Sequence, residues 1–272
     1  MVRSLWTGAT GMNAQQTNVD TIANNLANVN TMGYKTQVAE FKTLLYQTLQ
    51  TKTTTANGDT KPTSSQVGLG TRVSSLNSIF TQGALLASES NTAFAIEGDG
   101  FFAARCGDGQ TRYTRNGDFN WSLGAGNSLV LCTAEGYPVL DQQSRPITLP
   151  NTYIVNKITV SSNGDLLYPD ANNTPQPLGI TIGRFQFQNP AGMERYGDTL
   201  WSVTPVSGPA INEATSNAVT KGRVIQGYLE GSNVSVADEM VNLIVAQRAY
   251  EMNSKVITTT DTMMEQANNL KR

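Results

Sequence analysis

The sequence predicts an α+β fold, in which long N- and C-terminal helices pack as an α-helical coiled coil and a central all-β domain lies between them in the chain. Apolar residues recur every seven positions at both ends. The middle consists of short apolar runs separated by turn signals. A polar stretch between the first helix and the β domain predicts an extended connection.

The N-terminal helix is expected over residues 1–32, as one half of an inner coiled-coil domain. Its seam residues, four of them spaced by seven, are Leu5, Met12, Val19, Ile22 and Leu26. Gly33 follows as a helix stop. The other positions are mostly uncharged amides and hydroxyls, which can be buried where they find hydrogen-bond partners. This composition suits a helix with neighbours on every side, although an ordinary surface helix with an amide-rich face is also compatible with it.

A connecting segment and the C-terminal helix are expected over residues 221–272. The seam is again spaced by seven and consists of Val236, Leu243, Tyr250, Ile257 and Met264. A second string, Ala249, Val256, Met263 and Leu270, lies beside it and widens the apolar face. Ser235 and the acidic residues Asp238 and Glu239 mark the beginning of the helix.

The central β domain is expected over residues 76–220. Its apolar runs are split by Gly98-Asp99-Gly100, Gly107-Asp108-Gly109, Asn116-Gly117-Asp118 and Asn163-Gly164-Asp165, which are turn sequences. An extended connecting region covers residues 33–75. It contains a Thr-rich polar insertion at about residues 50–70, whose composition alone predicts a linker or loop. Representative residues of this insertion are Thr51, Thr55, Gly58, Pro62 and Ser65.

Ordering one residue costs about 1–2 kcal/mol of backbone entropy, and burying a Leu-sized side chain returns roughly 1.5–3 kcal/mol. A seam of four apolar residues cannot offset the ordering of a helix of about thirty. We therefore expect the chain ends to be mobile in the free monomer and to become ordered when copies pack together. Identical subunits that pack head to tail without closing a ring form an open helical filament.

Composition excludes several functions. The chain has 272 residues, a formal net charge of −2 and no histidine. The near-zero charge argues against nucleic-acid binding, and the missing imidazole excludes Ser-His-Asp and Cys-His catalysis. Two cysteines, Cys106 and Cys132, are too few for a structural zinc site, and we expect two buried free thiols or a single disulfide. We expect no catalytic, cofactor-binding or metal-binding residues, no membrane span and no cleaved signal peptide.

Two alternative classes make different predictions. An enzyme would need a carboxylate-only site on the β domain, drawn from Glu97, Asp99, Asp108 and Asp118, although these residues flank turns, where Asp is common. A soluble binding module such as a secreted adhesin would be a stable monomer with ordered ends.

Three motifs nevertheless resemble the flagellar rod and hook axial proteins. They are Ile22-Ala23-Asn24-Asn25-Leu26-Ala27-Asn28 followed by Gly33-Tyr34-Lys35, then Glu97-Gly98-Asp99-Gly100-Phe101-Phe102, and finally Gln247-Arg248-Ala249-Tyr250-Glu251. The resemblance runs nearly end to end. Within the family, the length and the polar insertion are similar to those of members that form the straight, distal part of the rod, and the alternative is a proximal rod or hook subunit.

The resemblance implies a non-enzymatic subunit of a hollow helical homopolymer, without cofactors. The shaft would transmit torque from motor to hook and conduct exported axial proteins. Implied partners are further copies of the chain, proximal rod proteins, the hook protein, the bushing rings of the peptidoglycan layer and outer membrane, and the flagellar type III export apparatus. The implied location is the periplasmic rod of the basal body. The insertion, Thr51 to Ser65, would lock neighbouring subunits and stiffen the tube.

Overall fold

A computed structural model describes residues 2–50, 65–124, 126–170, 174–197, 199–216 and 219–270. The chain forms two compact units. Unit 1 consists of Met1–Ala27, Gln37–Ser78 and Ser235–Arg272, and unit 2 consists of Asn28–Thr36 and Ile79–Val234. The fold is α+β, as the sequence predicts, with a helix at each end of the chain and a β-rich centre.

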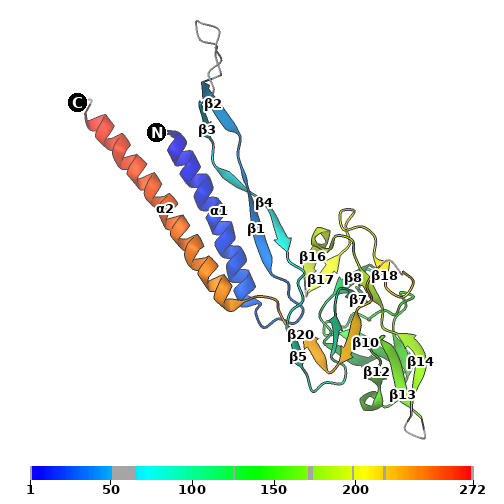
Figure 1. Ribbon diagram of the computed structural model, residues 1–272. Coiled ribbons are helices and arrows are strands. Elements are labelled where there is room, and N and C mark those ends of the chain that lie inside the picture. Colours follow the sequence, from blue (N-terminus) through cyan, green and yellow to red (C-terminus); the bar gives the residue numbers. More distant parts are fainter. Residues whose placement is uncertain are drawn as a thin grey trace. The chain divides into compact units, whose positions relative to one another are not determined.

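Unit 1 contains both helices, α1 (Val2–Ala27) and α2 (Val236–Asn269), and an antiparallel ribbon. The ribbon pairs β1 (Gln37–Thr43) with β4 (Thr71–Ser78) and β2 (Tyr46–Gln50) with β3 (Ser65–Gly68). Helix α1 lies between α2 and the ribbon, as Figure 1 shows. The connecting region therefore contains paired strands that pack on α1.

Helix α1 ends at Ala27, five residues before the expected end at residue 32. The chain turns here because Asn and Thr side chains compete with the helix for backbone hydrogen bonds. The Thr31 N–H donates to the Asn28 carbonyl at 3.2 Å, and the Thr31 hydroxyl donates to Asn28 Oδ1 at 3.1 Å. Gly33, the expected stop, instead has φ of +71° and donates its N–H to the Glu230 carbonyl at 2.8 Å.

Unit 2 is built from short antiparallel strands. A six-stranded sheet has the order β16-β17-β8-β7-β15-β18, with β16 (Glu194–Gly197), β17 (Leu200–Ser202), β8 (Thr111–Thr114), β7 (Phe101–Arg105), β15 (Arg184–Gln186) and β18 (Ile211–Asn212). Two three-stranded sheets comprise β11 (Thr148–Pro150), β10 (Ser128–Thr133) and β9 (Phe119–Leu123), and β12 (Thr159–Val160), β13 (Asp165–Pro169) and β14 (Pro175–Thr181). Two pairs join β5 (Leu85–Ala87) to β20 (Tyr228–Glu230) and β6 (Phe94–Glu97) to β19 (Arg223–Gln226). Two short 3₁₀ helices cover Val155–Lys157 and Pro190–Gly192.

Strand β7 separates the two apolar cores of unit 2. Its side chains alternate, so Phe101 and Ala103 enter one core with Tyr113 and Trp201, whereas Phe102 enters the other. The second of these cores also contains Phe94, Phe119, Leu131, Ile147 and Leu166. Burial on both faces explains the continuous apolar run at this position in the sequence.

The four turn sequences rich in Gly, Asn and Asp separate strands, as predicted. They lie between β6 and β7, β7 and β8, β8 and β9, and β12 and β13. Gly98 and Gly100 have φ of +100° and +135°, which side chains disfavour, so glycine permits this tight turn. Cys106 and Cys132 are both buried and free.

Candidate assembly surfaces

The two helices of unit 1 run antiparallel, side by side. Thr260 Oγ1 donates to Ser4 Oγ at 3.4 Å near one end of the pair. Near the other end, Asn25 Nδ2 donates to Glu239 Oε1 at 3.4 Å. The start of α1 therefore lies beside the C-terminal half of α2, and the end of α1 lies beside the start of α2. Both ends of the chain belong to one unit (Figure 1).

Glycine allows the helices to approach closely. A Cβ placed on Gly8 would lie 2.9 Å from Ile257 Cγ1, and one placed on Gly11 would lie 2.9 Å from Asn253 Nδ2. Glycine inside a helix costs about 0.8–1 kcal/mol relative to alanine. Glycine has no side chain, so an apolar repeat does not mark these two positions in the sequence.

The structure places the predicted seam residues at the edges of this contact as well as within it. Ile22 is buried. Six residues are half-buried: Leu5, Met12, Val19, Leu26, Leu243 and Met264. Ile257 is half-buried against Gly8. Val19 and Tyr250 line one groove of about 360 Å³ with Gln16, Gln247 and Glu251. Val236 and Tyr250 are more exposed, at 45% and 42%.

Asn25 joins three elements of unit 1. Its side chain is 1% exposed. Asn25 Oδ1 accepts from the Gln37 N–H at 2.9 Å, and Asn25 Nδ2 donates to the Gln37 carbonyl at 2.8 Å. The amide therefore pairs with β1 as a neighbouring strand would, while it also reaches Glu239 on α2. This is a buried amide with hydrogen-bond partners, as the composition of the first helix predicts.

Helix α2 has a second apolar surface that is exposed to solvent. We call this surface the α2 stripe; it comprises Val241, Val245, Met252, Val256 and Met263, which are 47–63% exposed. Val245 and Met252 are seven residues apart. Val256 and Met263 continue a second seven-residue spacing, which begins at the half-buried Ala249. A groove of about 530 Å³ runs along it, lined by Met252, Val256 and Met263 with Lys255, Thr259 and Thr260. Helix α1 therefore covers only part of the broad apolar face predicted for this helix.

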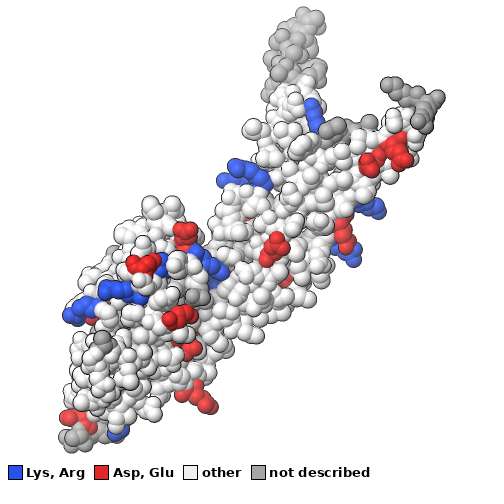
Figure 2. All heavy atoms as spheres, turned by 180° about the vertical axis from the view of Figure 1, so that it is seen from behind, with Lys and Arg blue, Asp and Glu red and all other residues white. Residues whose placement is uncertain are grey.

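Charged groups are sparse on unit 1. Figure 2 shows a surface that is mostly neither acidic nor basic over the terminal helices. On α2, Arg248 Nη1 lies 2.8 Å from Glu251 Oε2 in an exposed ion pair. Lys255, Asp261 and Glu265 are exposed as well. The polar side of α2 is thus charged, whereas that of α1 is rich in amides.

The ribbon carries exposed apolar side chains near its β2–β3 end, namely Leu45, Tyr46 and Leu49. Of the residues predicted to stiffen an assembly, Ser65 begins β3 and pairs with Gln50. Thr51, Thr55, Gly58 and Pro62 lie outside the described residues. The described part of the insertion therefore forms an antiparallel pair within unit 1.

The carboxylates considered for catalysis do not form a metal-binding cluster. Asp108 pairs with Arg112, which lowers the pKa of the Asp108 carboxyl, and Glu97 and Asp99 are exposed. Within the described ranges, no three Cys, Asp or Glu side chains gather as metal ligands would. No helix in the described part of the chain is long and apolar enough to cross a bilayer.

A helix pair that unites both chain ends, with an exposed apolar stripe along α2, is typical of structural proteins that act through assembly. Three family profiles match successive parts of the chain: "Flagella basal body rod protein" over residues 5–35, "Flagellar hook protein FlgE/F/G D1 domain" over residues 95–168, and "Flagellar basal body rod FlgEFG protein C-terminal" over residues 225–270. The chain belongs to the family of flagellar rod and hook axial proteins.

Relatives extend along the whole chain. A protein of Borreliella burgdorferi named flagellar basal-body rod protein FlgG is 48% identical and covers 100% of both chains. Proteins with the same name from Agrobacterium fabrum and Bacillus subtilis are 42% and 35% identical and cover 96% and 100% of this chain, and 97% and 100% of their own. The relatives are structural flagellar proteins, and this chain is a structural protein rather than an enzyme.

Proposed function

We propose that the chain is a structural subunit of the distal rod of the bacterial flagellar basal body. Copies polymerise into a straight, rigid, hollow drive shaft that transmits torque from the motor to the hook and conducts exported axial proteins. The observation that carries this proposal is the exposed α2 stripe on a chain whose full-length relatives are rod proteins.

The occupant of the α2 stripe is a helix of a second copy. A seven-residue spacing fits another helix, since it keeps one seam facing one helical partner. Within the described residues, α1 and α2 are the only helices longer than three residues, and α1 already packs on α2. A second helical partner therefore comes from another molecule. The side chains of the stripe are already partly buried, so covering each of them contributes less than the roughly 1.5–3 kcal/mol of complete burial.

The terminal helices form the coiled-coil inner layer of the shaft. Exposed apolar side chains and the glycine-rich contact leave the isolated pair with little buried apolar surface. The pair consequently becomes fully ordered only when neighbouring copies cover the stripe. The charged side of α2, with Arg248 and Glu251, faces the water-filled lumen, because a charge in that position remains solvated.

The insertion contributes stiffness. Ser65 and Gln50, the described residues on either side of the segment, pair as the ends of strands β3 and β2. The segment from Thr51 to Ser65 locks neighbouring subunits and prevents the tube from bending. Deleting it yields a more bendable rod, and rods that stay straight and stiff after the deletion contradict this role.

The partners and location follow from this assignment. The rod contacts proximal rod proteins at one end and the hook protein at the other, and it turns inside bushing rings in the peptidoglycan layer and outer membrane. Subunits reach the tip through the flagellar type III export apparatus, and the finished rod lies in the periplasm.

Electron microscopy of cells that lack this protein tests the assignment. We expect loss of the hook and filament, with the inner base and the proximal rod retained. A base that ends before the proximal rod indicates a proximal subunit, and a complete rod without a hook indicates a hook subunit. Either result overturns the distal-rod assignment while it preserves the family.

A further inference from the structure

The chain passes between unit 2 and unit 1 four times, at the peptide bonds 27–28, 36–37, 78–79 and 234–235. On the side of unit 2, three of these bonds begin or end at Thr36, Ile79 and Val234. The residues are far apart in the sequence. Within unit 2, however, one side chain forms hydrogen bonds with Thr36 and Ile79 and belongs to the residue directly before Val234.

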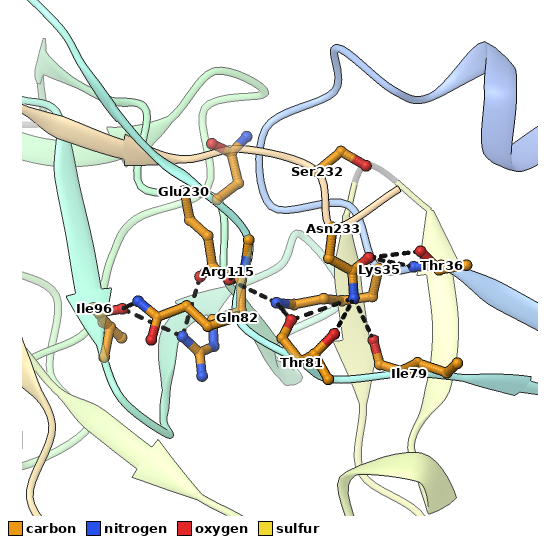
Figure 3. A network of polar contacts seen from close by, with 12 residues as sticks. Lys35, Thr36, Ile79, Thr81, Gln82, Ile96, Arg115, Glu230, Ser232 and Asn233 are labelled. Carbon is orange, nitrogen blue, oxygen red and sulfur yellow. Dashed lines mark hydrogen bonds and ion pairs between the residues drawn. The ribbon is translucent and has the colours of Figure 1, made fainter. Parts of the chain in front are cut away.

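That side chain is Asn233 (Figure 3). Asn233 Oδ1 accepts from the Thr36 N–H at 2.7 Å and from the Thr36 hydroxyl at 2.8 Å. Asn233 Nδ2 donates to the Ile79 carbonyl at 2.9 Å and to Thr81 Oγ1 at 2.9 Å. A backbone bond closes the arrangement, since the Ile79 N–H donates to the Thr36 carbonyl at 2.9 Å.

A buried ion pair supports this side chain from the interior of unit 2. Lys35 Nζ donates to the Thr81 carbonyl at 2.7 Å, and the same carbonyl accepts from Asn233 Nδ2 at 3.3 Å. Lys35 Nζ also bonds to Glu230 Oε1 at 2.6 Å, three residues before Asn233. Glu230 Oε1 accepts in addition from the Gly83 N–H at 3.0 Å. The same three stretches of chain are thus tied together twice, once near the surface and once in the interior.

We propose that Asn233 is a positioning residue that gathers three of the four exits of the chain from unit 2 at one point, with the Lys35–Glu230 pair as its anchor. The proposal concerns unit 2 alone and does not depend on the function assigned above.

Only a carboxamide satisfies both sides of this arrangement. Its oxygen has lone pairs for the N–H and hydroxyl of Thr36, and its nitrogen has two protons for the oxygens of Ile79 and Thr81. An aspartate keeps the acceptors for Thr36 but turns an anion toward two carbonyl oxygens. Alanine removes every one of these bonds. A comparison of Asn, Asp and Ala at position 233 therefore separates the bonds to Thr36 from the bonds to Ile79 and Thr81.

Hydrogen exchange of the full chain, resolved at single amides, tests the proposal. The amides to follow are those of Thr36, which donates to Asn233, and Ile79, which donates to Thr36. Asn233→Ala is expected to accelerate exchange at both amides at least tenfold. Asn233→Asp is expected to preserve the slow exchange of Thr36 and to accelerate that of Ile79. A loss of general stability would not produce this difference.

The matched control is Asn189→Ala, which removes an Asn side chain of unit 2 that bonds to Val206 and not to the exits. It should leave both amides at the rate of the unchanged chain. The amide of Phe102 in the buried strand β7 reports on the integrity of the fold. Unchanged exchange at Thr36 in Asn233→Ala, or equal acceleration of Thr36 and Ile79 in Asn233→Asp, overturns the proposal. Should the alanine variant fail to fold, the aspartate variant alone decides the question.

Discussion

Lys35 Nζ lies 2.6 Å from Glu230 Oε1, and both side chains are fully withdrawn from solvent. Glu230 Oε2 also lies 3.1 Å from Arg115 Nη1, so that one carboxylate faces two buried cations. Burial lowers the pKa of Lys35, and the attraction of Glu230 opposes this shift. Removing the Glu230 carboxylate therefore leaves two buried cations without their counter-charge, whereas removing one cation leaves the carboxylate paired with the other.

We predict that Glu230→Gln destabilises unit 2 more than Lys35→Met does. The glutamine leaves two buried cations without a counter-charge, which costs about 3–5 kcal/mol. The methionine fills the volume of the Lys35 stem and leaves Glu230 paired with Arg115 and Gly83, so we expect a loss of roughly 1–3 kcal/mol. Urea unfolding of the two variants measures the order. An equal or reversed order would show that Glu230 is not shared.

Asn25 provides the second prediction. Asn25→Ala leaves the N–H and carbonyl of Gln37 without their side-chain partner, at a cost of about 1–3 kcal/mol for each buried group. The loss should appear as a lower urea midpoint for unit 1 in assembled rods. The control is the neighbouring Asn24→Ala, which removes an exposed contact with Gln37 Oε1 at 3.4 Å and should cost less than about 0.5 kcal/mol. Similar losses in both variants argue against the pairing of Asn25 with β1.

Alanine substitutions at Gly33 and Gly109 distinguish the cost of backbone strain from the cost of a steric clash. Both have positive φ, +71° and +79°, so alanine at either position costs about 1–2 kcal/mol. A Cβ on Gly33 would also lie 2.5 Å from the Asn116 nitrogen, whereas nothing lies within 4 Å of one on Gly109. Gly33→Ala should therefore lower the melting temperature clearly more than Gly109→Ala. Equal shifts would mean that the close approach at Gly33 relaxes without cost.

Glu239 should make the stability of unit 1 dependent on pH. Burial raises the pKa of the Glu239 carboxyl, and the hydrogen bond from Asn25 opposes the shift. A raised pKa means that the folded state holds the proton more tightly than the unfolded state, so stability falls as pH rises from about 4.5, the unperturbed pKa, through the folded pKa.

Glu239→Gln should remove this slope and stabilise unit 1 near neutral pH. Thermal unfolding of assembled rods between pH 4 and pH 8 measures the effect. Asp261→Asn is the control, because Asp261 is an exposed acid further along the same helix and its removal should leave the slope in place. A slope that survives in Glu239→Gln must come from another group.

The sequence predicts much of the architecture because the relevant signals are local. Turn sequences such as Gly98-Asp99-Gly100 separate strands where expected, since glycine permits a positive φ whatever the surroundings are. The repeat of apolar residues likewise reveals both helices, because it follows from the geometry of one helix.

Other features depend on distant partners and could not be predicted. Gly8 and Gly11 form the helix contact through their lack of side chains, so no apolar repeat marks them. The pairing of Asn233 with Thr36 joins residues 197 positions apart, and nothing near either residue announces it. The bond from the Gly33 N–H to the Glu230 carbonyl likewise joins two residues that are remote in the sequence.

The most direct measurement of the central claim is assembly of rods from subunits whose α2 stripe is changed. Met252→Glu combined with Val256→Glu places two charges in the exposed groove of the stripe, at side chains that are 63% and 47% exposed. Thr258→Glu combined with Thr262→Glu adds the same charges at exposed positions outside the groove. We predict that the first pair yields folded monomers and cells without rods in electron micrographs, whereas the second pair yields normal rods. Normal rods from the first pair would contradict the account.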